Sequence, residues 1–424
     1  MGFITSFNLC IFILITFLYF YQIIYVGASL FGEKRKNHFV QRAKKQHRYG
    51  VVIAARNERT VIGELIRSIR GQNYPAELID IFVVADNCTD DTAAVAREAG
   101  AIVYERFNTD LVGKGYALDY IFNIIHNQYG DDIYEGYFIF DADNLLDENY
   151  VAEMNKVFDS GYRVLTSYRN SKNYDTNWLT AGSSLWFLRE AKYLNNSRMI
   201  LNTSCAVSGT GFLVSSQIIQ KNHGWKYHLL TEDIEFSIDS ALQGETIGYC
   251  EKAVLYDEQP VTFRQSWNQR LRWSKGFYQV MAHYGVKLVK GMFRSNCSFL
   301  SCYDMFMTIA PATFVSLFCI LMNVVFLILG LLNPAVLSAV VPLALTSILF
   351  SFVNVYVTLY AVGLLTTITE WKSIKCAASK KILYSFTFPL FILSYIPIAV
   401  VALFQKVEWK PIAHSVVKSV EELR

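Results

Sequence analysis

The chain has 424 residues, of which 53% are hydrophobic, 15% aromatic and only 18% charged. Such an apolar composition is unusual for a soluble protein and favours a membrane protein that also carries a sizeable polar domain. The 39 basic and 36 acidic residues give a net charge of +3, so no overall basic excess points to nucleic acid as a partner.

An uncharged apolar run opens the chain. Residues 3–31 exceed the ~20 residues that cross a bilayer core. The run is too long for a signal peptide, lacks a basic start, and has aromatic residues where a small-residue cleavage site would lie. We therefore predict a transmembrane helix over 1–32. The linker 33–48 is rich in Lys and Arg, which favours the cytosolic side, so we expect the N-terminus outside and the next domain in the cytoplasm.

Short β-rich runs alternate with helical segments over residues 49–277, which predicts an α/β domain with a mainly parallel central sheet. The sequences YGVVIAARNE, DIFVVADNCTDD and YFIFDADN each combine a buried strand with a polar loop. Ligands of parallel α/β sheets bind beyond the carboxyl ends of the strands. The polar residues after these strands are therefore the first candidates for a site.

Apolar sequence returns after the α/β domain. We expect amphipathic interfacial helices over 278–303 and about three transmembrane helices over 304–404. Counting three crossings leaves the tail 405–424 outside, although Pro389 and Pro397 leave open a break or a re-entrant segment. The chain is thus expected to be a multi-pass protein of the plasma membrane with a cytoplasmic domain.

Three acids stand at predicted strand ends. Asp86 follows IFVVA, and Asp141 and Asp143 follow YFIF, so their carboxylates are expected to converge at one sheet edge. Such like charges are costly without a nearby cation. Mg²⁺ or Mn²⁺, which takes ligands from one or two carboxylates plus substrate phosphates, would satisfy them. A solvated turn is the alternative for Asp141 and Asp143.

Two further clusters have both a functional and a structural interpretation. Lys114 lies between two glycines before a predicted helix and could bind phosphate, or could be an ordinary surface lysine. Thr231, Glu232 and Asp233 form the start of a helix, where acids stabilise the first turn without any catalytic role. The glycines of the segment 208–211 allow a ligand to approach the backbone, or mark a tight hairpin.

The motif QRLRW, residues 269–273, is equally ambiguous by itself. Arginine offers fork-shaped donors for phosphate oxygens, and tryptophan offers a flat face on which a sugar can stack. A tryptophan between arginines ahead of a membrane segment could also be an interface anchor.

In order and spacing, DNCTDD, DADN, TED and QRLRW resemble the signature of processive, membrane-integrated family 2 glycosyltransferases. That group includes the cellulose, chitin, hyaluronan and poly-N-acetylglucosamine synthases, and the resemblance covers essentially the whole chain. It implies a GT-A-type α/β cytosolic domain combined with a transmembrane helical region. It also implies an enzyme that uses a nucleotide-diphosphate sugar and inverts at the anomeric carbon. Two departures are the first motif, where two acids and a glycine are common, and the lack of an obvious cellulose-synthase-type gating-loop motif after Trp273.

The resemblance implies roles for individual residues. Asp233 would be the general base, and Asp143 the chief metal ligand together with Asp141. The residues implied to bind the nucleotide sugar are Ala54, Asn57, Glu58, Asp86, Lys114, Asp141, Arg270 and Arg272. Those implied to bind the acceptor are Glu232, Gly209, Thr210, Gly211, Gln269 and Trp273.

The expected function is polymerisation of a β-linked exopolysaccharide from a UDP-sugar, with UDP-glucose slightly favoured over UDP-N-acetylglucosamine, and passage of the chain through the membrane. The alternative enzyme transfers one sugar to a lipid such as diacylglycerol, ceramide or polyprenyl phosphate. A non-enzymatic transporter or scaffold would explain the helices but not the four motifs. The expected partners are the UDP-sugar, the polysaccharide or lipid acceptor, the bilayer, and accessory export or modification proteins.

Overall fold

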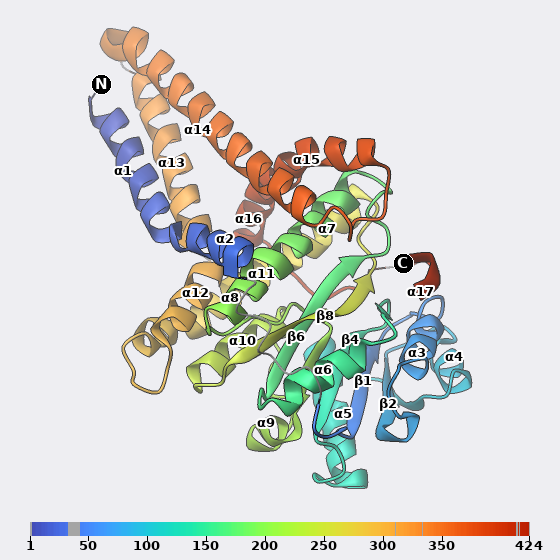
Figure 1. The fold of residues 1–424 in the computed structure, drawn as a ribbon. Coiled ribbons are helices and arrows are strands. Elements are labelled where there is room, and N and C mark those ends of the chain that lie inside the picture. The colour runs from blue at the N-terminus through green and yellow to red at the C-terminus, as the bar shows by residue number, and fades with distance from the viewer. Residues whose placement is uncertain are drawn as a thin grey trace.

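The structure is a computed structural model that describes residues 2–32, 43–309, 311–332, 334–412, 414 and 416–423. Most of the basic linker expected at 33–48 therefore lies outside the described residues. Figure 1 shows three layers: a sheet domain, a group of helices packed on one end of it, and long helices that project away from that group.

An eight-stranded sheet with the order β3-β2-β1-β4-β7-β6-β8-β5 forms the centre of the α/β domain. Its strands are β1 Tyr49–Ala55, β2 Ile79–Asp86, β3 Ile102–Arg106, β4 Gly136–Asp141, β5 Leu145–Leu146, β6 Val164–Ser171, β7 Phe212–Ser215 and β8 Ile247–Asp257.

The sheet is mixed rather than mainly parallel. Four strand pairs are parallel, but β7 runs antiparallel to both of its neighbours and β5 antiparallel to β8. The chain approaches β7 through Gly209, whose carbonyl oxygen lies 2.6 Å from Lys114 Nζ at the carboxyl edge of β4. It therefore enters β7 from that edge and runs back. The hydrophobic sequence of β7 does not indicate in which direction the strand runs.

Alternation along the strands divides the core between the two faces of the sheet. Val52 belongs to one hydrophobic cluster, and its neighbours Val51 and Ile53 belong to the other. Successive strand side chains point to opposite faces, so both faces need covering helices. On one face lie α3 Ile62–Arg70, α4 Thr92–Glu98 and α6 Tyr150–Asp159; on the other lie α5 Lys114–Tyr129, α9 Ser216–Lys221 and α10 Glu232–Leu242.

A second layer of helices joins the sheet domain to the apolar helices (Figure 1). Its members are α2 Tyr21–Phe31, α7 Trp178–Arg189, a π-helical turn Glu190–Asn195, α8 Asn196–Ile200, α11 Phe263–Gly291, α12 Phe299–Ile309, α15 Ala378–Leu393 and α16 Tyr395–Phe404. Helix α11 begins with a capping box formed by Thr262 and Gln265. It runs unbroken through QRLRW, so the division expected at residue 277 falls within one helix.

Four segments are long and apolar enough to cross a membrane: Ile4–Phe31, Phe314–Leu332, Val340–Thr369 and Ala378–Phe404. By their length and composition they indicate a membrane protein. The first combines most of α1 Gly2–Tyr19 with α2, and the next two belong to α13 Pro311–Leu332 and α14 Pro334–Thr369. The last differs from the others, because it breaks at Ser394 between α15 and α16 and 33% of its apolar window is buried in protein.

The tail after α16 returns to the sheet domain, where α17 Val420–Leu423 lies (Figure 1). The backbone N–H of Val416 donates to Glu258 at 2.9 Å, and Lys418 Nζ donates to the carbonyl of Lys172 at 2.7 Å. Our expectation that the tail lies on the opposite side of the membrane is therefore wrong. The count assumed three crossings after α11, whereas these contacts of the tail with the sheet domain require an even number.

Candidate active site

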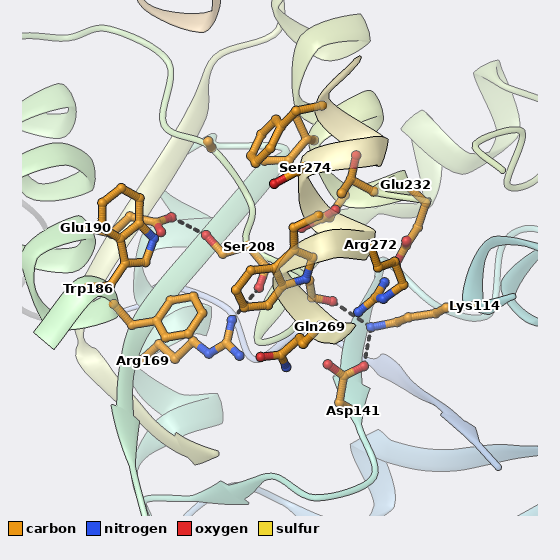
Figure 2. Close-up of a pocket in the computed structure, with 18 of the residues that line it drawn as sticks. Lys114, Asp141, Arg169, Trp186, Glu190, Ser208, Glu232, Gln269, Arg272 and Ser274 are labelled. Carbon is orange, nitrogen blue, oxygen red and sulfur yellow. Dashed lines mark hydrogen bonds and ion pairs between the residues drawn. The ribbon is translucent and has the colours of Figure 1, made fainter. Parts of the chain in front are cut away.

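A cavity of about 630 Å³ lies between the carboxyl edge of the sheet and the second layer of helices. Figure 2 shows part of its lining. The sequence-predicted site residues that line it are Ala54, Glu58, Asp86, Lys114, Asp141, Asp143, Gly209, Glu232, Asp233, Gln269, Arg272 and Trp273. All four motifs therefore contribute to one space.

The strand ends meet where the strand order reverses around β1. Ala54 of β1 is in register with Asp141 of β4, and Ala55 is in register with Ala85, which precedes Asp86 in β2. Ligands of open α/β sheets bind at such a switch point. Asp86 is held there by Arg106, whose Nη1 lies 2.6 Å from Asp86 Oδ1 in a nearly water-free pair.

Lys114 at the start of α5 contacts both the DADN motif and the glycine segment 208–211. Its Nζ lies 2.5 Å from Asp141 Oδ1 and 2.6 Å from the carbonyl oxygen of Gly209, as Figure 2 shows. Gly113, which precedes it, has a φ of 136° that favours glycine. The ammonium thus neutralises Asp141 and remains on the cavity wall, where a diphosphate could replace the carboxylate as its partner.

Asp143 is buried and accepts a hydrogen bond of 2.8 Å from the backbone N–H of Glu258. Burial alone would raise the pKa of this carboxyl group, but the positive charges of His414 and Lys172, together with that hydrogen bond, hold it below its usual value. His414 Nδ1 lies 2.9 Å from Glu58 Oε1. Asp143 is therefore kept as a carboxylate inside the protein.

The two acids that begin α10 are electrostatically coupled. Burial and the adjacent charge of Asp233 raise the pKa of Glu232 to about 7, while Lys114 opposes the shift. Burial also raises the pKa of Asp233, against the charges of Lys114 and Arg272. A carboxylate with a raised pKa is a better proton acceptor than an ordinary surface one.

Gly209 separates the two carboxylates that face the cavity. A Cβ atom on this residue would lie 3.7 Å from Asp233 Oδ2 and 4.0 Å from Asp141 Oδ2. Its φ of 82° also disfavours a side chain. The space between the possible base and the strand-end acid is therefore lined by bare backbone, which leaves room for a ligand.

Side chains of the QRLRW motif on helix α11 form part of the cavity wall. Gln269, Arg272 and Trp273 line the cavity, and Arg272 Nη1 donates to the carbonyl of Leu230 at 3.1 Å. The ring of Trp273 meets that of Phe187 edge-on, with centroids 6.1 Å apart. The helix approaches TED closely at Gly276, where a Cβ atom would lie 2.5 Å from Thr231 Cγ2.

Arg270 does not line the cavity, and our assignment of it to the nucleotide sugar is corrected. Its side chain is 1% exposed and stacks on Phe391, with Nη1 donating to the carbonyl of Phe391 at 3.0 Å and to Ser394 Oγ at 2.5 Å. On a helix, residues 270 and 272 point in different directions. Through these contacts, Arg270 instead stabilises the break between α15 and α16.

Three other predicted residues are not part of the cavity lining. The side chain of Asn57 accepts a 2.8 Å hydrogen bond from the N–H of Thr89, which joins the first two strand-end loops. Thr210 Oγ1 accepts from the N–H of Asp141 at 2.9 Å. Gly211 has a φ of 68°, and a Cβ atom there would collide with Leu255. These residues shape the site without reaching the cavity.

Sequence reasoning missed a part of the lining that comes from the tail. Trp409, Lys410 and His414 line the cavity, and Arg56 lies over the ring of Trp409 at 5.5 Å from its centroid. A tryptophan, a lysine and a histidine in a short polar tail after the last apolar run were an available signal. We overlooked these residues because we expected the tail to lie on the other side of the membrane.

Sequence reasoning also missed a polar group at the middle of the cavity. Arg169 at the end of β6 pairs with Asp257 at the end of β8 and donates to the carbonyl of Ser208 at 2.7 Å. Glu190 accepts a hydrogen bond from Ser208 Oγ (Figure 2). Strand-end polar residues in YRNS and LYDEQ were the overlooked signals.

The opposite end of the cavity is built by helices and is mostly apolar. Its lining residues include Tyr19, Gln22, Arg189, Met307, Ile309, Leu317, Ile320, Ile392, Ile396 and Ala399. Leu317 and Ile320 lie within the candidate span Phe314–Leu332. The cavity therefore extends from strand-end carboxylates to side chains of membrane-type helices.

The carboxylates fit a metal that arrives with its ligand rather than a resident metal. In the described part of the chain, no group of three or more His, Cys, Asp or Glu side chains is arranged to hold an ion. Mg²⁺ and Mn²⁺ sites that use substrate phosphates need only one or two protein carboxylates. Asp143 and Asp141 meet that smaller requirement.

Comparison with known proteins agrees with this arrangement. The family profile described as "Glycosyltransferase like family 2" matches residues 47–276. Among curated relatives, the β-monoglucosyldiacylglycerol synthase of Synechocystis sp. is 25% identical over 55% of this chain and 48% of its own length. The poly-β-1,6-N-acetyl-D-glucosamine synthase of Staphylococcus epidermidis is 22% identical over 54% of each chain. The chain spans about half the length of these curated relatives.

A solved mannosyltransferase of Pyrobaculum calidifontis, in complex with GDP-Man and Mn²⁺, is 15% identical with a TM-score of 0.48, over 91% of this chain and 98% of that chain. The family profile covers more than half of the 424 residues and includes DNCTDD, DADN, TED and the first strand. On that match, the chain is a glycosyltransferase and belongs to glycosyltransferase family 2.

Proposed function

We propose that this enzyme transfers a sugar, with inversion at the anomeric carbon, from a UDP-sugar to a hydroxyl group of an acceptor at the cytoplasmic face of the plasma membrane. The observation that carries the proposal is the continuous cavity between the strand-end carboxylates and the apolar helices. One end suits a charged, water-soluble donor, and the other end suits an acceptor associated with the membrane.

The donor would lie over the strand ends. Ala54, Glu58 and Asp86 lie where the nucleoside would bind, and the positive charges of Lys114 and Arg272 act on Asp233. Asp143 and Asp141 would hold Mg²⁺ or Mn²⁺, which when bound would help to neutralise the leaving diphosphate. Arg272 and Lys114 would stabilise the negative charge that develops on the diphosphate as the bond to the sugar breaks.

Asp233 is proposed as the general base. Its raised pKa suits a carboxylate that accepts a proton from the acceptor hydroxyl while the oxygen attacks the far face of the donor sugar. The new glycosidic bond forms as the bond between the sugar and the diphosphate breaks, and UDP leaves with that electron pair. Because a single displacement suffices, no side chain has to form a covalent intermediate.

The acceptor end of the reaction would lie against α11. Trp273 offers an aromatic face beside Gln269, and both line the cavity on the same helix as Arg272. Aromatic faces bind the C–H groups of sugars and other flat apolar surfaces. Glu232 and Gly209 would complete this part of the acceptor site.

Polymerisation of a β-linked polysaccharide from UDP-glucose or UDP-N-acetylglucosamine, with passage of the chain through the membrane, is a second candidate. The aromatic side chains of Trp273 and Phe187, which meet edge-on, would also suit a sugar at the end of a polymer. The similarity to a poly-β-1,6-N-acetyl-D-glucosamine synthase also supports it.

The decisive experiment incubates the purified protein in nanodiscs with a panel of UDP-sugars and Mg²⁺ or Mn²⁺. Released UDP and the length of the labelled product are measured. Release of UDP coupled to a glycosylated product supports transfer, and one sugar per acceptor separates single transfer from polymerisation. Absence of transfer from every nucleotide sugar tested, with the protein folded, would contradict the proposal.

A further inference from the structure

The apolar end of the cavity has the chemistry of a lipid site. Its aliphatic side chains come from four different helices: Met307 from α12, Leu317 and Ile320 from α13, Ile392 from α15, and Ile396 from α16. A sugar polymer has hydroxyl groups that need hydrogen-bond partners along its path. Aliphatic walls that continue into candidate spans suit acyl or prenyl chains instead.

Two arginines line this end of the cavity, and only one of them has a carboxylate partner. Arg198 pairs with Asp304, with Nε and Nη2 at 2.6 and 3.1 Å from its two oxygens, and its Nη1 donates to Asn195. Arg189 makes one hydrogen bond, from Nη2 to Gln22 Oε1 at 2.9 Å. Within the described residues, no carboxylate lies within ion-pairing distance of Arg189.

Arg189 therefore has unused binding capacity. A guanidinium group carries five N–H donors, and anions such as phosphate or carboxylate can bind two of them at once. Burial lowers the pKa of Arg189, although the nearby charge of Glu190 opposes this, and the guanidinium lies over the ring of Trp186 at 5.2 Å from its centroid. The carboxylate of Glu190 is engaged by Ser208. An anionic ligand would supply the missing charge.

Arg189 also lies a short way along the wall from the proposed base. Glu190 follows it directly and contacts Ser208, and the next residue, Gly209, borders Asp233. A ligand whose anionic group binds Arg189 could therefore extend a hydroxyl group toward Asp233. Its apolar chains would lie on the aliphatic walls.

We infer that the acceptor is a membrane lipid that carries a phosphate or carboxylate group between its apolar chains and the hydroxyl group that receives the sugar, with Arg189 as the anion-binding residue. This inference rests on the proposed function. It names a substrate class for the same site and assigns a role to a residue outside the four motifs.

The test compares the wild-type enzyme with Arg189→Gln and Arg189→Lys in nanodiscs of phosphatidylcholine with graded phosphatidylglycerol. Binding of phosphatidylglycerol is measured by native mass spectrometry, and transfer by labelled sugar in the organic extract. We expect Arg189→Gln to weaken lipid binding and raise the lipid KM about tenfold or more, with the donor KM unchanged. The lysine variant should recover part of the loss. Arg163→Gln, which removes an exposed arginine paired with Glu245, is the matched control.

Lipid binding by Arg189→Gln equal to that of the wild type would overturn the inference, as would equal use of diacylglycerol and phosphatidylglycerol by the wild type. Binding of soluble glycerol 3-phosphate and of inorganic phosphate is measured separately. If either binds as tightly as the lipid, the apolar walls do not contribute to binding. If Arg189→Gln does not fold, the lysine variant carries the comparison. Arg189-dependent lipid binding without sugar transfer from any donor would contradict the proposed function alone.

Discussion

The two ends of the cavity differ in how their charges are balanced. At the donor end, charges are already paired with one another, at 2.5 to 2.9 Å: Lys114 with Asp141, Arg106 with Asp86, and His414 with Glu58. At the apolar end of the cavity, most of the wall is aliphatic, and Arg189 has no carboxylate partner among the described residues. On the proposed function, a donor would exchange ion pairs to bind, whereas a lipid acceptor would mainly have to leave the bilayer.

The largest expected effect lies at the junction of the two ends. Replacing Asp233 by Asn removes the proton acceptor and preserves the shape of the side chain. We expect kcat to fall by about 10²- to 10⁴-fold while both ends still bind their ligands. Rates of UDP release and calorimetric UDP affinity measure the two properties separately.

Asp239→Asn is the matched control for this change, because Asp239 lies on the same helix and pairs with Lys226 instead of lining the cavity. Substantial transfer by Asp233→Asn would remove Asp233 as the base. A large loss of UDP binding would place Asp233 at the donor end.

The next largest expected effect concerns binding of the acceptor at Trp273. Trp273→Ala removes an aromatic face and should raise the acceptor KM about tenfold, with little change in the donor KM. Trp267→Ala is a suitable control, since Trp267 lies on the same helix but packs with Leu271 and Ile398. Equal increases in both KM values would show that Trp273 serves the two ends alike.

A pH experiment tests the electrostatic setting of Asp233 on α10. Asp233 must be ionised to act, so activity should fall as pH falls through its raised pKa. Arg272→Gln removes a positive charge that opposes this shift, which should raise the pKa of Asp233 further and move the acidic limb of the kcat/KM profile to higher pH. A limb that stays in place, or moves to lower pH, would contradict this electrostatic interaction.

The smallest effect belongs to the donor end. Trp409→Ala removes the ring beneath Arg56, an interaction worth about 0.5–1 kcal/mol at exposed sites, so the donor KM should rise a few-fold. The acceptor KM should not change. Lys406→Ala, at an exposed tail position, provides the control. A selective rise in the acceptor KM would reverse the assignment of the tail to the donor end.

Much of the donor end was predictable from local sequence patterns. Alternating strands and helices place Ala54, Asp86 and Asp141 at one sheet edge, and the strand register brings them together. The periodicity of the chain suffices for this result, because parallel strands share the edge at which their carboxyl ends lie.

The features that were missed depend on contacts between distant segments. His414 and Glu58 are 356 residues apart, and Arg270 and Phe391 are 121 residues apart. Neither pairing leaves a periodic signal, since the first depends on where the tail packs on the sheet domain and the second on how α11 packs against α15. The antiparallel direction of β7 has the same origin, because it depends on where the chain enters the strand.

The return of the tail to the sheet domain has a consequence for membrane topology. Val416 and Leu423 lie on the same domain as β1, so the chain between α11 and the tail must cross the bilayer an even number of times. We expect α13 and α14 to form one outward and return pair, and Ala378–Phe404 to lie along the surface or to re-enter. A reporter fused after residue 424 would consequently be found in the compartment that contains the donor.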